Sequence, residues 1–143
     1  MVNTVNPFLV AGAALSAVAA LLHLACIAFG APWYRFMGAG EQMVKMVSNG
    51  RWYPTVVTLI IAAVLSIWSL YALSGAGVIP KLPFVRLALC AITGIYLLRA
   101  VAFPALTTYI PGNSMAFWLW SSAICFVFGV VHFIGLCQVL GRL

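Results

Sequence analysis

Acidic residues are almost missing from this chain of 143 residues, which has one glutamate, Glu41, and no aspartate. Paired-carboxylate catalysis and a Ser-His-Asp triad are therefore excluded, as is a carboxylate proton relay within a membrane. Only 6% of the residues are charged, against about 25% in soluble domains, so an ordinary soluble domain is excluded as well. The seven Lys and Arg residues give a formal charge of +6 but are scattered among apolar blocks, which argues against a nucleic-acid partner.

Long apolar runs dominate what is present, since 66% of the residues are hydrophobic. A helix needs about 20 mostly apolar residues to cross a bilayer, and four stretches meet that need: residues 7–30, 54–75, 84–104 and 115–140. The first run has no Lys or Arg before it and is too long for the core of a cleaved signal peptide, so we expect it to persist. The sequence predicts a single domain over residues 1–143, an all-α, polytopic bundle of four transmembrane helices.

The connection between the first two runs, residues 31–53, is longer than the others and rich in aromatic side chains. Within it, residues 40–50 predict a short interfacial amphipathic helix with Glu41 and Lys45 paired one turn apart. Its apolar side would carry Met43, Val44, Met46 and Val47. This helix is either an anchor at the lipid head groups or a lid over a site.

Membrane orientation follows only weakly from the basic residues, because three of them lie toward each face of such a bundle. The basic loop after the first span and Arg99 near the same end of the third favour a cytoplasmic first loop.

Ionisable side chains inside the predicted spans are the main indication of a binding site. Such a group costs about 2.5 to 3.5 kcal/mol to place deep in lipid and usually faces the protein interior or water. His23 and Arg99 fall at similar depths near the first-loop end of their spans, and Tyr96 shares a helix face with Arg99. We expect a polar cavity that opens toward the first loop and is lined by His23, Tyr96, Arg99, Glu41, Arg51 and Tyr53.

The charges of this cavity predict its ligand. An arginine fork suits a carboxylate or phosphate, and the surrounding bundle is apolar, so we expect an amphipathic or anionic small molecule. The alternative is structural: His23 hydrogen-bonds a backbone carbonyl, and Arg99 either pairs with Glu41 or extends to the lipid head groups.

Cofactor and metal sites are not expected. Four cysteines lie inside the predicted spans without a C-x-x-C pair, at positions 26, 90, 125 and 137. His23, Cys26 and Cys125 are soft ligands for Cu(I) or Zn, but no pair of spans supplies a full ligand set at matched spacing. His23 and His132 differ in depth by roughly 15 Å at 1.5 Å per helical residue, which disfavours one haem held by both within a chain.

Three segments carry a resemblance: FGAPWYRFMGAGEQMVKM at residues 29–46, YALSGAG at 71–77 and RLALCAITGIYLLR at 86–99. Through them the chain resembles small four-span proteins of the bacterial inner membrane, and its broad shape is similar to DoxX-like small membrane proteins. The resemblance implies the fold and an inner-membrane location, and it implies no activity.

The function we expect first is binding or transport of the amphipathic or anionic molecule in the cavity near the first loop. One alternative is an integral membrane enzyme acting on a lipid or quinone-like substrate, with His23 or Glu41 as acid or base and Arg99 as electrostatic stabiliser. Another is an accessory subunit without a site of its own. Small residues along the spans suit helix contacts between chains, so we expect membrane lipids as partners and a homo-oligomer or a subunit of a membrane complex.

Overall fold

The computed structural model describes residues 4–110 and 112–143, and within them the chain forms seven helices and no strand. The helices are α1 (Pro7–Phe29), α2 (Ala31–Phe36), α3 (Glu41–Ser48), α4 (Tyr53–Ala76), α5 (Val85–Val101), α6 (Phe103–Tyr109) and α7 (Met115–Val139). The all-helical prediction is confirmed for this part of the chain.

Three of these helices, α1, α4 and α7, are long and apolar enough to cross a membrane, with 23, 24 and 25 residues. A fourth candidate exists only if α5 and α6 are counted together, because they meet at a bend of 71°. The chain is therefore a helical protein with three to four helices suited to span a membrane, which indicates an integral membrane protein.

The run predicted over residues 84–104 contains α5 and ends where the bend lies. α5 ends at Val101, and Pro104 follows in the first turn of α6. A proline ring clashes with the carbonyl four residues earlier and disfavours helical backbone at the residue before it. An apolar stretch of sufficient length therefore does not continue as a straight helix.

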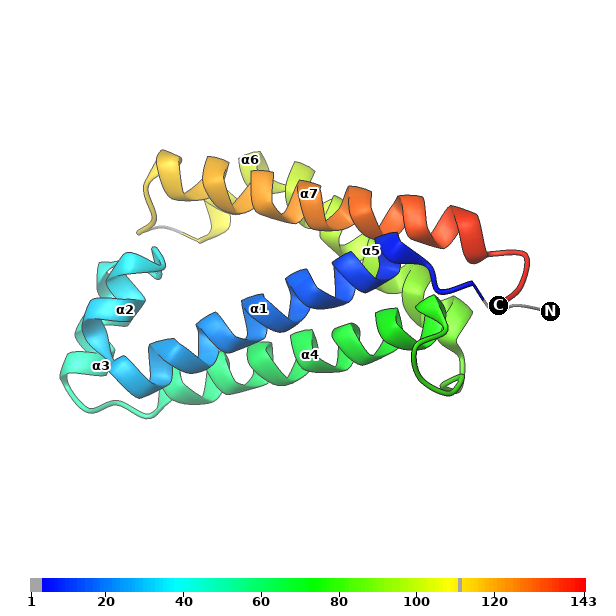
Figure 1. Ribbon diagram of the computed structural model, residues 1–143. Helices are drawn as coiled ribbons and strands as arrows, with labels where there is room; N and C mark the ends of the chain where they lie inside the picture. The colour runs from blue at the N-terminus through cyan, green and yellow to red at the C-terminus, as the bar shows by residue number, and fades with distance from the viewer. Residues whose placement is uncertain (1–3, 111) are drawn as a thin grey trace.

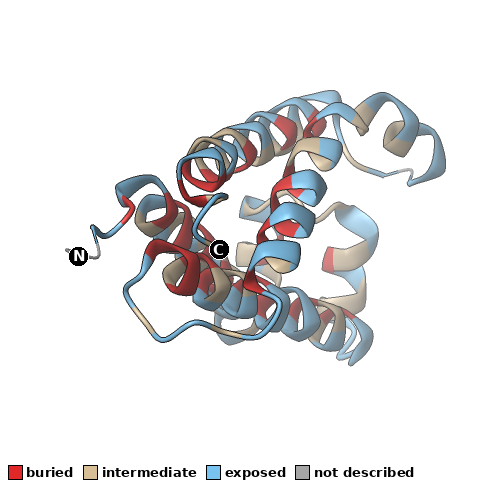
Figure 2. Cartoon of the chain, turned by 90° about the vertical axis from the view of Figure 1, so that its right-hand side faces the viewer, coloured by how far each residue is buried: buried red, intermediate tan, exposed pale blue. Residues whose placement is uncertain are grey.

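The long helices form two antiparallel pairs, α1 with α4 and α5 with α7 (Figure 1). The pairs meet where α1 begins and α7 ends, and they lie further apart toward α2 and α3 (Figure 1). Buried residues lie on the inner sides of the helices, while the outer sides are exposed (Figure 2). Many exposed side chains are large and apolar, as expected for surfaces that face lipid.

Small residues set the close contact where the two pairs meet. A Cβ atom on Gly135 of α7 would lie 2.7 Å from Cγ of Leu9, and one on Gly12 of α1 would lie 2.8 Å from Cε1 of His132. Both are closer than real side-chain carbons approach each other. Because these positions are glycine, the Leu9 side chain of α1 packs against the α7 backbone and the His132 side chain of α7 packs against the α1 backbone. Small residues allow the same close approach between membrane helices in general.

A short helix, α3, lies within the predicted residues 40–50, and α2, which was not predicted, precedes it. Val44 of α3 is buried with Cys26 and Tyr34, while Met43 and Val47 pack against that cluster. The predicted Glu41–Lys45 pair does not form, because Glu41 accepts from Arg35 Nε at 3.0 Å. Arg35 competes better because its planar fork binds a carboxylate through two N–H groups.

Candidate functional site

Arg99 lies near the end of α5, where α5 packs antiparallel to α7. Its Nη2 donates to Ser121 Oγ at 2.8 Å and its Nη1 to Ser122 Oγ at 3.4 Å. The guanidinium carbon also lies 5.2 Å from the ring centre of Trp118, within the range of a cation–π contact. The residues at 118, 121 and 122 share one face of α7 because they are three and four positions apart.

No carboxylate of the chain neutralises Arg99. The one acidic residue, Glu41, is bonded through both carboxylate oxygens to Arg35, at 3.0 and 3.3 Å. That pair is solvent-exposed, and the Arg35 guanidinium holds the pKa of Glu41 below its usual value. An arginine keeps its charge in proteins, so Arg99 retains a positive charge that only neutral hydroxyls and an aromatic ring contact.

Arg99 and Tyr96 line a groove of about 270 Å³ between α4, α5 and α7. The remaining lining residues are Ile60, Ile61, Val64, Leu65, Trp68, Ile95 and Cys125. The surface of this groove is apolar, so Arg99 lines it with its carbon stem, while its guanidinium is directed to Ser121 and Ser122 at the α7 side. A charged group at the edge of an apolar groove suits a molecule with an apolar tail and an anionic end.

Tyr96 belongs to the core as much as to this groove. Its hydroxyl lies 2.9 Å from Ser16 Oγ of α1, and its ring centre lies 5.0 Å from that of Trp68 and 5.2 Å from that of His132. The hydroxyl is therefore occupied between helices, and the ring is the part that forms the groove wall.

His23 lies in a different cavity, of about 240 Å³, between α1, α4, the two short helices of the first loop and the start of α7. Its Nδ1 donates to the Ala19 carbonyl at 2.7 Å. This is the backbone hydrogen bond that the structural alternative predicted. Ile61 lines both this cavity and the Arg99 groove, so the two hollows share a wall.

The other predicted residues lie apart from both hollows. Glu41 lines a shallow hollow of about 160 Å³ beside Arg35, and Tyr53 lines another of about 250 Å³. Arg51 is exposed in the connection before α4. The six predicted residues therefore do not line a single cavity, and the predicted Arg99–Glu41 alternative does not form either. An exposed ion pair spares Glu41 the cost of burial.

Sequence reasoning missed two of the groups around Arg99, Trp118 and Ser121. Their helical spacing with Ser122 was visible in the sequence, but the rotation of α7 toward α5 was not. Similarly, Cys125 lies in the groove with Arg99 and not in the cavity with His23.

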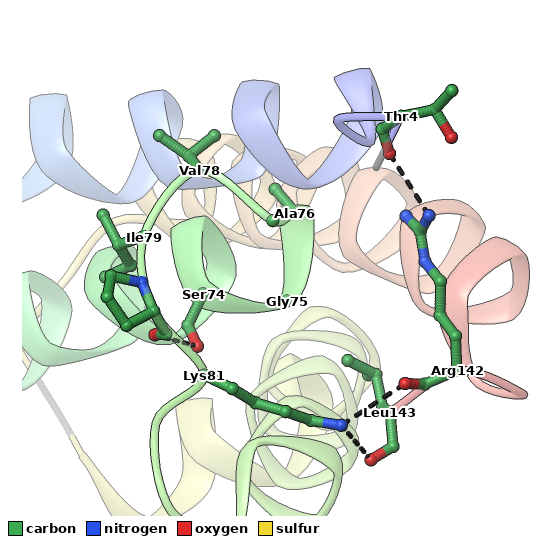
Figure 3. Close-up of a pocket in the computed structure, with 11 residues that line it drawn as sticks. Thr4, Ser74, Gly75, Ala76, Val78, Ile79, Lys81, Arg142 and Leu143 are labelled. Carbon is green, nitrogen blue, oxygen red and sulfur yellow. Dashed lines mark hydrogen bonds between the residues drawn. The ribbon is translucent and has the colours of Figure 1, made fainter. Parts of the chain in front are cut away.

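A further hollow, of about 450 Å³, lies at the end of the molecule where α4 and α7 finish. Figure 3 shows Lys81 and Arg142 on its walls. Lys81 Nζ donates to the Leu143 carbonyl at 2.7 Å, and Arg142 Nη1 donates to the Thr4 carbonyl at 3.2 Å. Both cations thus connect segments that are distant in sequence, which is a structural role.

Among the described residues, no group of three or more His, Cys, Asp or Glu side chains could hold a metal ion. No family model, curated protein or solved structure matches this chain.

Proposed function

We propose that this protein binds an amphipathic small molecule with an anionic head group from within the membrane, with the head at Arg99 and the tail along the groove. The observation that carries the proposal is the guanidinium of Arg99, which has no carboxylate partner in the chain and lies at the edge of a hydrophobic groove lined by the stem of the same side chain. A ligand that brings both a negative charge and apolar carbon matches both features.

The hydrogen bonds of Arg99 support this assignment. A guanidinium has five N–H donors, and Arg99 uses two of them on Ser121 and Ser122. The serine bonds and the Trp118 ring hold the group in place, while the remaining donors suit a carboxylate or phosphate. The apolar wall residues of α4 and α5 then give the tail a hydrophobic contact.

The membrane arrangement that fits this proposal has α5 and α6 as one broken fourth span and α3 at the membrane surface. Both chain ends then lie on one side of a bacterial inner membrane and the first loop in the cytoplasm. Reporter fusions at residue 143 and within the first loop test this arrangement, since the two must report opposite sides.

A brominated long-chain fatty acid is the probe for the groove, because bromine quenches tryptophan fluorescence and Trp68 lines the wall. In detergent-solubilised protein we expect saturable quenching by the acid and weaker quenching by the alcohol of the same length. Arg99→Gln should weaken binding of the acid by about tenfold or more, since a hydrogen bond to a charged group contributes about 1.5 to 3 kcal/mol.

Arg86→Gln is the matched control, because Arg86 is exposed at the opposite end of α5. Equal binding of acid and alcohol, or equal loss in both variants, would contradict the proposal.

Flux of the acid into proteoliposomes that is lost in Arg99→Gln would make the protein a transporter, whereas binding without flux would make it a binding protein. Native mass spectrometry tests the accessory-subunit alternative. That alternative requires a complex of this chain with a second polypeptide to be released from the detergent micelle.

A further inference from the structure

Soft-ligand side chains gather around the cavity at the first-loop end. Its lining includes an imidazole, a thiol and two thioethers, which belong to His23, Cys26, Met37 and Met43. His23 and Cys26 are three residues apart on α1, so they share a helix face. Met37 follows α2, Met43 lies in the first turn of α3, and both pack against the buried cluster that contains Cys26.

We propose that this cavity binds one Cu(I) ion through the side chains of His23, Cys26, Met37 and Met43. Thiolate and thioether sulfurs select soft cations such as Cu(I), and imidazole suits copper as well. The two methionines belong to the short helices of the first loop, so a bound ion would connect this loop to α1.

His23 is already prepared as a ligand. A carbonyl oxygen can only accept, so the 2.7 Å contact with Ala19 places the proton of His23 on Nδ1. In the neutral ring, Nε2 then carries the free lone pair. A backbone carbonyl that holds the other ring nitrogen is the usual arrangement behind a metal-bound histidine.

Charge distinguishes Cu(I) from divalent ions in this cavity. The lining contains no carboxylate, so Cys26 is the only group there that supplies a negative charge to an ion. On binding, the thiol transfers its proton to solvent as the copper–sulfur bond forms, and copper stays at +1. One thiolate with Cu(I) is neutral overall, whereas Zn²⁺ would leave a net positive charge in a largely apolar cavity, which is costly.

Among the described residues, no third His, Cys, Asp or Glu side chain joins His23 and Cys26, so the two thioethers complete the ligand set. Methionine has three rotatable bonds and adapts to irregular spaces. Met37 and Met43, which both line the cavity, can therefore adapt to an ion by rotamer changes.

The experiment is anaerobic titration of the reduced, detergent-solubilised protein with Cu(I), in competition with the chelator bathocuproine disulfonate. We expect one Cu(I) per chain, sulfur and nitrogen neighbours in its X-ray absorption spectrum, and no comparable binding of Zn²⁺. Cys26→Ser should weaken binding by more than about tenfold, the lower bound for loss of even an outer-shell partner. The double variant Met37→Leu, Met43→Leu keeps volume and so should fold, yet it should also weaken binding.

The controls are Cys137→Ser and Met115→Leu, whose native side chains are exposed elsewhere on α7. They should bind copper like the unmodified protein. Equal loss in the controls, tight Zn²⁺ binding, or retention of copper by the double methionine variant would overturn the site. Arg99→Gln should leave copper affinity unchanged, so the copper site and the proposed function can fail separately.

Discussion

The helix contact around Leu9 and the space beneath α2 and α3 are packed in opposite ways. Leu9, Leu89 and Val139 have no exposed surface, and glycines bring α1 and α7 into direct contact beside them. Away from this contact the two helix pairs lie further apart (Figure 1), with a hollow of about 240 Å³ beside α1, α4 and the first loop and one of about 270 Å³ between α4, α5 and α7. Close packing provides the rigid part of the fold, and the looser end provides space for ligands.

The largest effect should come from adding one methyl group at the close contact. In Gly135→Ala the new Cβ would lie 2.7 Å from Leu9 Cγ and 3.0 Å from Leu9 N. Because the backbone cannot yield as a flexible side chain does, we expect a loss of about 1 to 3 kcal/mol in unfolding free energy. Thermal unfolding in detergent, followed by circular dichroism, measures it.

Gly94→Ala is the control for that substitution. Apart from its chain neighbours and the backbone of its own helix, no described heavy atom lies within 4 Å of a Cβ at this position. Alanine favours a helix over glycine by up to about 1 kcal/mol, so this variant should keep or raise stability. If Gly135→Ala were equally tolerated, the contrast between the two ends would not hold.

A smaller effect is expected at Tyr96, which lies between the close contact and the groove. Tyr96→Phe removes the 2.9 Å hydrogen bond to the buried Ser16 hydroxyl, and a hydrogen bond of this kind contributes about 0.5 to 1.5 kcal/mol to stability. The double variant with Ser16→Ala should recover part of the loss. Equal stability of the single and double variants would show that this hydrogen bond does not connect α1 and α5 energetically.

The smallest effect should be the pH response of the exposed Arg35–Glu41 pair. The folded-state pKa of Glu41 is lowered, mainly by its hydrogen bond to Arg35. Stabilisation by the pair is thus fully present above the unfolded pKa and is lost as the pH falls through the lower folded value. Stability measured from pH 7 down to acid should show this loss, and Glu41→Gln should abolish it.

Most of the helical framework was predictable because hydrophobic length and capping act locally. The run predicted at 54–75 is α4 (Tyr53–Ala76), and the run predicted at 115–140 is α7 (Met115–Val139). The run predicted at 84–104 ends close to the break before α6, because Pro104 is visible in the sequence. The short helix α6 that follows the break was not predicted, since seven residues carry too little local pattern.

The candidate site was less predictable because it depends on how helices rotate about their axes. Depth along a span can be read from chain order, which is why Arg99 and Tyr96 do lie on one groove. Rotation is set by packing between distant segments, and it directs Tyr96 to Ser16, Arg99 to Ser121, and Cys125 away from His23. The Met37 and Met43 thioethers come into the cavity only through the fold of the first loop.

The bend after α5 also bears on how the protein would respond to bilayer thickness. The 17 residues of α5 rise about 25 Å at 1.5 Å each, which is less than the roughly 30 Å hydrocarbon core of a typical bilayer. Hydrophobic mismatch of this kind is relieved by local thinning of the lipid. Because Arg99 lies in the last turn of α5, thinning there would bring phosphate head groups and water toward its guanidinium, and a thicker bilayer would hold them away.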